Sequence, residues 1–93
     1  MAESKISKHD IDIQVLSDVD IIQWAVDNSQ DFVPKDVYCS SLCRSLPSAS
    51  AGFMRVYKNT SSLLFVILFS LDGNIYTRTK NSTWFSWKTV SYS

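Results

Sequence analysis

The chain has 93 residues, of which 45% are hydrophobic, 13% aromatic and 19% charged. This composition is typical of one small globular domain, and it excludes a disordered, collagen-like or low-complexity chain. Nine basic and nine acidic residues give a formal net charge of zero, so bulk charge gives no reason to expect binding to nucleic acid or to an anionic membrane.

The N-terminal stretch MAESKISKHDIDIQ is polar, whereas a signal peptide needs an apolar segment of about 7 to 15 residues. We therefore expect synthesis in a cytoplasm, with a flexible leader over residues 1–9 and a single domain over residues 10–93. The longest apolar run covers residues 63–69, which is far shorter than the roughly 20 residues of a membrane helix. No membrane insertion is expected.

The first expected elements are a strand and a helix. Residues 10–16 alternate between apolar and polar side chains, the pattern of a half-buried strand. Ser17 can cap a helix over residues 18–28, because acidic residues occupy its first turn, near the positive end of the helix dipole. The apolar side chains that recur at helical spacing are Val19, Ile22 and Val26, with Trp24 covering one edge.

The rest of the chain predicts consecutive antiparallel strands. A strand around residues 37–42 leads into the small-residue turn SLPSASAG. The further expected strands, separated by turn-forming sequences, cover residues 52–57, 63–69, 74–79 and 84–90. The predicted fold class is therefore α+β: a small antiparallel β-meander sheet with one N-terminal helix packed on it.

The apolar strand over residues 63–69 constrains this architecture. Burying one large apolar side chain stabilises a protein by about 1.5 to 3 kcal/mol, so the run contributes on the order of 10 to 20 kcal/mol, comparable to the stability of a whole domain. We therefore expect the strand to be covered on both faces. The helix covers one face, and either the other strands or a neighbouring subunit cover the second.

Cys39 and Cys43 are the only cysteines, in the spacing CSSLC. We expect two free, buried thiols, because an extended segment places them about 13 Å apart, beyond the reach of a disulfide. A zinc site would need two further ligands, and the only histidine, His9, lies in the leader. No metal and no cofactor are expected.

Signatures of catalysis are also missing from the sequence. A base at His9 would not be held near a nucleophile. Asp10 and Asp12 would project from one strand face about 7 Å apart, a spacing seen in glycosidase carboxylates, but alternating acids on an exposed strand are the favoured interpretation. No GxSxG motif, phosphate loop or dinucleotide fingerprint occurs. We expect that the protein is not an enzyme.

Charge is unevenly distributed along the chain. Residues 1–31 hold seven acids and two bases, whereas residues 32–93 hold seven bases and two acids. One interpretation is neutralisation between the two halves of one fold or between packed subunits, and the other is a surface that receives anionic ligands. The sequence leaves both open.

The final segment, DGNIYTRTKNSTWFSWKTV, carries the candidate ligand-binding residues. As a hairpin it would place one tryptophan on each face of the sheet. An aromatic side chain beside arginine can stack on a sugar ring while the guanidinium binds hydroxyl or carboxylate groups. Cross-strand packing is the alternative role of each tryptophan. The candidate residues are Tyr76, Arg78, Trp84, Trp87 and Lys88.

The closing pattern GNIYTRT followed by STWFSWKTV resembles the C-terminal knob-type domains of bacteriophage tail fibres and tailocin fibres. Tyr76, Arg78, Trp84 and Trp87 match its aromatic, arginine and W-x-x-W positions. The helix around Trp24 and the LPSASAG turn are similar as well, so the resemblance covers residues 10–92. Unlike in a typical fibre protein, no long repetitive shaft sequence precedes the knob-like part within these 93 residues, which leaves open a complete small protein, an excised domain or an adaptor.

The resemblance implies a virion or particle component, commonly trimeric, that lies at the distal end of a fibre and contacts the host surface, often glycans. It thus implies localisation in the virion tail after synthesis in a bacterial cytoplasm, a host cell-surface glycan and other tail proteins as partners, and a homo-oligomer. In such domains the four matching residues can also maintain the fold.

Three functions follow. The leading one is a non-enzymatic, receptor-binding fibre domain that binds host carbohydrate. The alternative is a structural trimerisation, assembly or docking element of a phage tail or tail-like particle. The third, a single-stranded nucleic-acid binder that stacks bases on Tyr76, Trp84 and Trp87, is disfavoured by the zero net charge.

Overall fold

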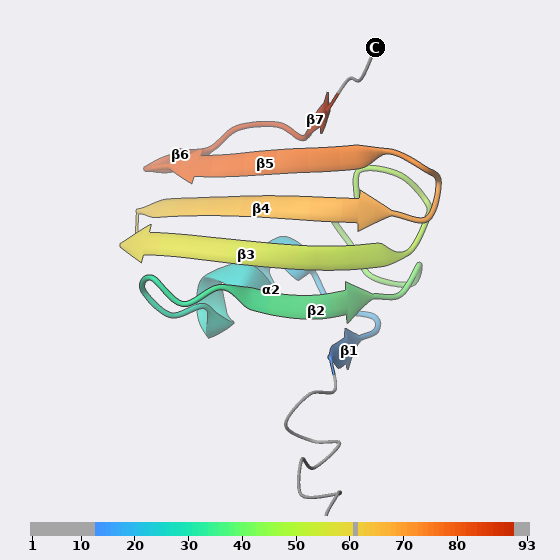
Figure 1. Cartoon of the computed structure of the whole chain (residues 1–93), viewed down its shortest axis with the longest axis horizontal. Helices are drawn as coiled ribbons and strands as arrows, with labels where there is room; N and C mark the ends of the chain where they lie inside the picture. Colours follow the sequence, from blue (N-terminus) through green and yellow to red (C-terminus); the bar gives the residue numbers. More distant parts are fainter. Residues whose placement is uncertain (1–12, 61, 91–93) are drawn as a thin grey trace, which may run out of the picture.

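The structure is a computed structural model that describes residues 13–60 and 62–90. The expected leader and the first residues of the expected first strand lie outside this range. Within it, one seven-stranded sheet has the order β1-β2-β3-β4-β5-β6, and β7 also pairs with β5. A single helix, α2, packs behind the sheet in Figure 1. The α+β class predicted from the sequence is thus confirmed.

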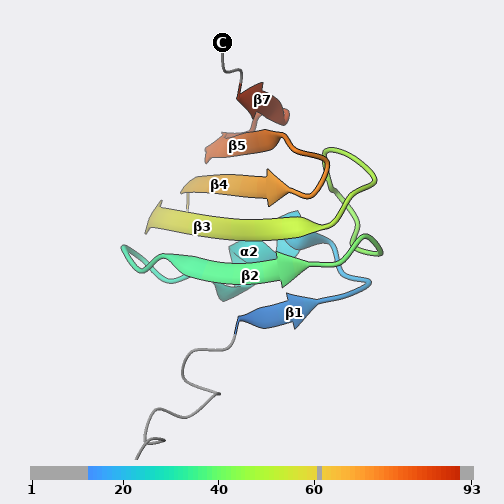
Figure 2. The ribbon, with the colours of Figure 1, turned by 45° about the vertical axis from the view of Figure 1, so that its right-hand side comes forward.

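The N-terminal part differs from a pure meander. Strand β1 (Gln14–Leu16) runs parallel to β2 (Lys35–Cys39), and α2 (Ile21–Asn28) connects them. Figure 2 shows the two strands side by side with the same direction. A parallel pair needs a crossover connection, and the helix provides it while it covers one face of the sheet. The remaining strand pairs are antiparallel, as expected.

The helix begins later than the sequence suggested, and its cap is Asp20 instead of Ser17. The Asp20 carboxylate accepts hydrogen bonds from the backbone N–H groups of Ile22 at 3.0 Å and Gln23 at 3.2 Å. Although burial opposes ionisation, these amide groups and nearby Arg44 hold the pKa of Asp20 below its ordinary value. Asp18 is still in the preceding turn, with a positive φ of 57°, so the helix could not start there.

The central strands are β3 (Gly52–Thr60), β4 (Leu63–Ser70) and β5 (Ile75–Asn81). Each lies within three residues of its expected position. The β4–β5 turn contains Gly73, whose φ of +94° suits glycine. At the start of β3, a Cβ atom on Gly52 would lie 2.6 Å from the carbonyl oxygen of Phe69, so the close approach of β3 to β4 requires glycine at this position.

The expected last strand, residues 84–90, is split in two. Thr83–Trp84 form β6 and Lys88–Val90 form β7, and both pair with β5. Between them the chain leaves the ladder over residues 85–87, so the two-residue alternation that the sequence suggested is interrupted. The prediction of one continuous strand is therefore wrong.

The covered face of the sheet, which packs against α2, holds the hydrophobic core. From the sheet its buried residues are aliphatic with few exceptions: Leu16, Val37, Cys39, Met54, Val56, Leu64, Val66, Leu68 and Tyr76. The helix contributes Ile21, Ile22 and Ala25. Of the expected helical stripe only Ile22 belongs to the buried core, and Val19, Trp24 and Val26 pack at the margin of this core.

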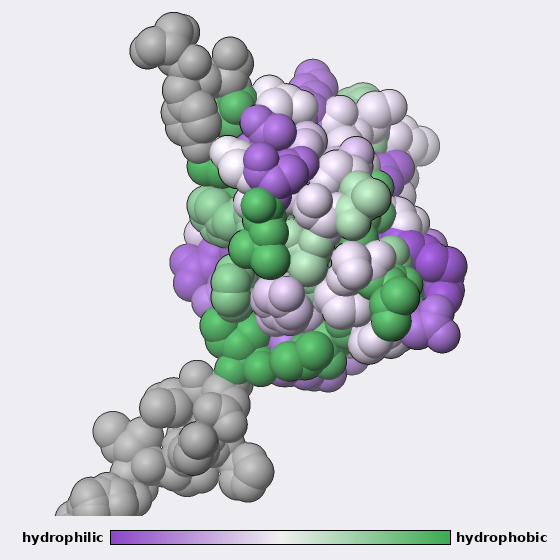
Figure 3. Space-filling model, turned by 90° about the vertical axis from the view of Figure 1, so that its right-hand side faces the viewer, coloured by the Kyte–Doolittle hydropathy of each residue, from purple (hydrophilic) through white to green (hydrophobic). Residues whose placement is uncertain are grey.

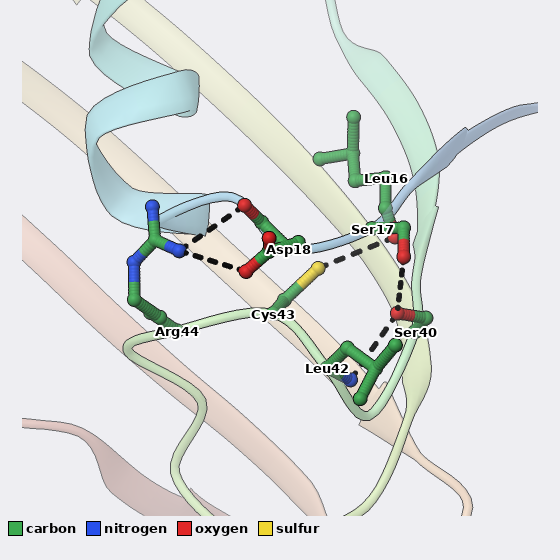
Figure 4. Close-up of polar contacts among 7 residues, drawn as sticks. All are labelled: Leu16, Ser17, Asp18, Ser40, Leu42, Cys43 and Arg44. Atoms are coloured by element: carbon green, nitrogen blue, oxygen red, sulfur yellow. Dashed lines mark hydrogen bonds and ion pairs between the residues drawn. The ribbon is translucent and has the colours of Figure 1, made fainter.

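Both cysteines are free and buried, as the sequence predicted. Burial and the neighbouring Cys43 raise the pKa of the Cys39 thiol to about 12, so Cys39 is a protonated core residue at neutral pH. The Cys43 thiol donates to the carbonyl oxygen of Leu16 at 3.2 Å. Figure 4 shows this contact beside the Arg44–Asp18 ion pair, where the β2–β3 loop meets the residues that precede the helix.

The opposite side of the sheet, called the open face here, has no element of the described chain packed on it. By strand register it comprises Val15, Asp36, Tyr38, Phe53, Arg55, Tyr57, Phe65, Ile67, Phe69, Ile75, Thr77, Thr79, Lys88 and Val90. Hydrophobic residues form much of the left-hand edge of Figure 3, the side that faces the viewer in Figure 1. Within the described residues, therefore, strand β4 is covered on one face only, and Phe65 and Phe69 remain exposed.

Candidate functional site

Tyr76 is a structural anchor of the turn between β4 and β5. Its side chain is only 9% exposed. Its hydroxyl donates to Oδ2 of Asp72 at 2.7 Å and accepts from Nδ2 of Asn74 at 3.3 Å. The hydrogen bonds from Tyr76 and from the Asn74 backbone lower the pKa of Asp72 to about 2. The tyrosine therefore fixes the turn, and its ring belongs to the core.

Arg78 and Trp84 are brought together by the pairing of β5 with β6. The guanidinium carbon of Arg78 lies 5.4 Å from the centroid of the Trp84 ring. The Nε group of Arg78 donates to the carbonyl oxygen of Phe85 at 2.7 Å. Contacts of this kind are worth about 0.5 to 1 kcal/mol at exposed sites. Lys80 is the ladder partner of Trp84, so two basic residues are neighbours of one half-buried aromatic residue.

Trp87 has a different role from Trp84, since it joins the terminal segment to a distant loop. Its indole N–H donates to the carbonyl oxygen of Ser45 at 2.8 Å. Both Trp84 and Trp87 pack against the buried core. The expectation of one tryptophan on each face is therefore wrong, because the chain leaves the ladder between them and the second ring returns to the covered side.

Lys88 lies apart from the other candidates. It is exposed on β7 and pairs with Thr77, which belongs to the open face. Of the five residues singled out in the sequence, the structure thus brings Arg78 and Trp84 into contact, while Tyr76 and Trp87 serve neighbouring turns and loops. We call Arg78, Lys80, Trp84 and Phe85 the terminal site. Lys80 and Phe85 are its two members that were not among the sequence candidates, and Phe85 is 52% exposed.

The open face is a second candidate site, with two hollows separated by Tyr57. One, of about 380 Å³, lies toward the β3–β4 turn and is bordered by the loop before β2. The other, of about 360 Å³, lies toward the opposite ends of these strands. Their walls are mostly apolar. The main side chains of the first are Phe32, Pro34, Tyr57, Leu63 and Phe65, and those of the second are Ile13, Phe53, Ile67 and Phe69.

An ion pair occupies the middle of the open face. Arg55 donates from Nε to Oδ1 of Asp36 at 2.6 Å and from Nη2 to Oδ2 at 2.7 Å. Its third contact, from Nη1, is to the hydroxyl of Tyr57 at 3.3 Å. The hydrogen bonds from Arg55 lower the pKa of Asp36, and Asp36 raises that of Arg55. This bidentate geometry leaves the face without an unpaired charge at its centre.

The sequence carries a signal for this face in the alternation of side chains along β3 and β4. Phe53, Arg55 and Tyr57 alternate with buried residues in β3, just as Phe65 and Phe69 do in β4. The alternation shows which side chains share a face, but hydrophobicity alone does not show which face the helix covers.

No group of three or more His, Cys, Asp or Glu side chains among residues 13–60 and 62–90 could hold a metal ion. The helix that the structure describes is too short to cross a membrane. His9, Asp10 and Asp12 lie outside the described residues.

One solved structure resembles this fold. It is the R1 pyocin fibre of P. aeruginosa, comprising its C-terminal residues 323–701, with a TM-score of 0.67 and 16% sequence identity. The match covers 86% of this chain and 21% of the fibre chain, so the chain corresponds to about a fifth of that structure. No family model matches the sequence, and no curated protein does. At this identity, the likeness concerns the fold.

Proposed function

We propose that the chain is a knob-type domain of a phage tail fibre or tail-like particle that binds the host surface without catalysing a reaction. The observation that carries this proposal is the likeness in fold to part of a pyocin fibre, over most of the chain. The match of Tyr76, Arg78, Trp84 and Trp87 to the closing pattern of such domains supports it independently. Synthesis in a bacterial cytoplasm and localisation in the virion tail belong to the same proposal.

The terminal site is the surface that suits a carbohydrate. The Phe85 carbonyl holds the Arg78 guanidinium through Nε, and the Nη groups of arginine can donate to sugar hydroxyl or carboxylate groups. Trp84 and Phe85 offer aromatic surface on which the apolar side of a sugar ring can stack. An immobilised cation beside an aromatic ring lowers the entropy that binding costs.

Binding of the oligomeric chain to host envelope fractions and to a glycan array tests this function. We expect binding that Phe85→Ala and Lys80→Gln weaken several-fold, since the first removes an exposed ring and the second the charge of a half-buried cation of the terminal site. Leu71→Ala is the matched control, because Leu71 is 66% exposed in the β4–β5 turn. A native assembly that ignores every envelope fraction would contradict the proposal.

A second candidate function is assembly, in which the domain joins copies of itself or docks to another tail protein. The uncovered open face favours it. The uneven charge of the sequence does not favour assembly, because the ion pairs Asp18–Arg44 and Asp31–Lys58 join the acidic part to the basic part within one chain. We therefore expect apolar, salt-insensitive association. Light scattering at low and high salt tests it, and a chain that is monomeric under both conditions would exclude self-assembly.

A further inference from the structure

We propose that the open face is the interface between copies of this chain, with the exposed Phe32 ring of one copy entering the hollow between Phe53 and Phe69 of another. This inference rests on the second of the two proposed functions and adds the surface, the occupant and the anchoring residue.

The amount of exposed aromatic surface is the first observation. Four aromatic side chains of the open face are between 37% and 47% exposed, which leaves roughly 300 Å² of ring surface in solvent at about 200 Å² for each side chain. One partner contributes about 800 Å² to a standard protein interface. Four residues thus supply more than a third of that area, before the aliphatic neighbours Val15, Ile67 and Val90 are added.

Phe32 is the second observation. Its side chain is 78% exposed, and its φ is 62°, a conformation that a bulky residue rarely adopts. The backbone N–H of Phe32 donates to the carbonyl oxygen of Lys58 at 2.7 Å, which fixes the strained loop against β3. A rigidly presented aromatic ring at the rim of an apolar surface has the form of an interface anchor.

The charge of the face favours a second copy over an anionic or sugar ligand. Asp36 and Arg55 neutralise each other by two hydrogen bonds, and Tyr57 accepts a third. At the centre of the face, identical copies therefore meet without net repulsion, and the exposed Lys88 lies at its β7 edge. A sugar needs several free hydrogen-bonding groups, but the walls of both hollows are mostly apolar. An aromatic ring from a copy fits such walls better.

Sedimentation velocity between about 1 and 100 µM tests the proposal. We expect the wild type to associate, and the variants Phe32→Ser and Phe53→Lys/Phe69→Lys to raise the dissociation constant by about 100-fold or more. Leu42→Lys is the control, since Leu42 is 69% exposed in the loop after β2, away from the open face, and we expect it to associate like the wild type. Circular dichroism checks that each variant is folded.

Hydroxyl-radical footprinting of the wild type supplies a measurement that needs no variant. We expect Phe32, Phe53 and Phe69 to be protected at high concentration and Leu42 to stay reactive. A wild-type chain that remains monomeric, whether or not it binds another tail protein, would overturn the proposal. Association that survives the Phe32 and Phe53/Phe69 changes would overturn the assigned interface and leave the assembly function standing. Loss of glycan binding alone would contradict neither the assigned interface nor the assembly function.

Discussion

The two faces of the sheet use the same strands but meet different surroundings. Along β4, Leu64, Val66 and Leu68 are at most 1% exposed, whereas their neighbours Phe65 and Phe69 are 37% and 47% exposed. The covered face is mostly aliphatic and fits the helix, while the open face is rich in aromatic residues around one ion pair. Equal hydrophobicity in a sequence can therefore mean a core on one side of a strand and a contact surface on the other.

The largest expected difference between the two faces is in the free energy of unfolding after truncation of two neighbouring residues of β4. Leu68→Ala creates a cavity in the core and should lower the free energy of unfolding by about 2 to 5 kcal/mol. Phe69→Ala removes a side chain that is nearly half exposed, so we expect less than half of that loss. Urea unfolding at a concentration where the chain is monomeric measures both. Equal losses would mean that the open face is packed within the chain.

A smaller effect is expected at Trp87, which fastens the terminal segment on the covered side. Trp87→Phe keeps an aromatic ring but removes the N–H that binds the Ser45 carbonyl, so it should cost about 1 kcal/mol of stability. Trp84→Phe removes no such bond among those the structure describes, and is the control. If Trp87→Phe instead left stability unchanged and abolished glycan binding, Trp87 would belong to the receptor site.

The smallest effect concerns pH. The folded-state pKa of Asp72 is about 2, below the value of about 3.9 in an unfolded chain. Its contribution to stability is therefore complete above the unfolded value and is lost as the pH falls toward 2. We expect Tyr76→Phe, which removes the main hydrogen bond to Asp72, to flatten the decline of Tm between pH 5 and 2 that the wild type shows. An unchanged slope would contradict this assignment.

Local patterns predicted most of the strands, because alternating side chains and turn residues act within a few positions of each other. Local patterns failed where contacts between residues far apart in the sequence determine where an element begins or ends. The helix begins at Ile21, with Asp20 as its cap, and not directly after Ser17, since Asp18 turns toward Arg44 from the β2–β3 loop. The last strand breaks where Trp87 reaches Ser45, 42 positions earlier in the chain. The candidate site was half predicted: the contact of Arg78 with Trp84 follows from strand pairing, but the anchoring of Tyr76 and Trp87 does not.

By itself, the sequence determined the fold class, the central apolar strand and the free, buried state of the two cysteines. These depend on the period of hydrophobic residues and on short turns, which are local properties. Only the tertiary structure decided that β1 runs parallel to β2, that both tryptophans of the terminal segment pack toward the core and that Phe53, Phe65 and Phe69 stay uncovered. The physical reason is that one short helix can cover only one face of a sheet, and its crossover selects which face that is.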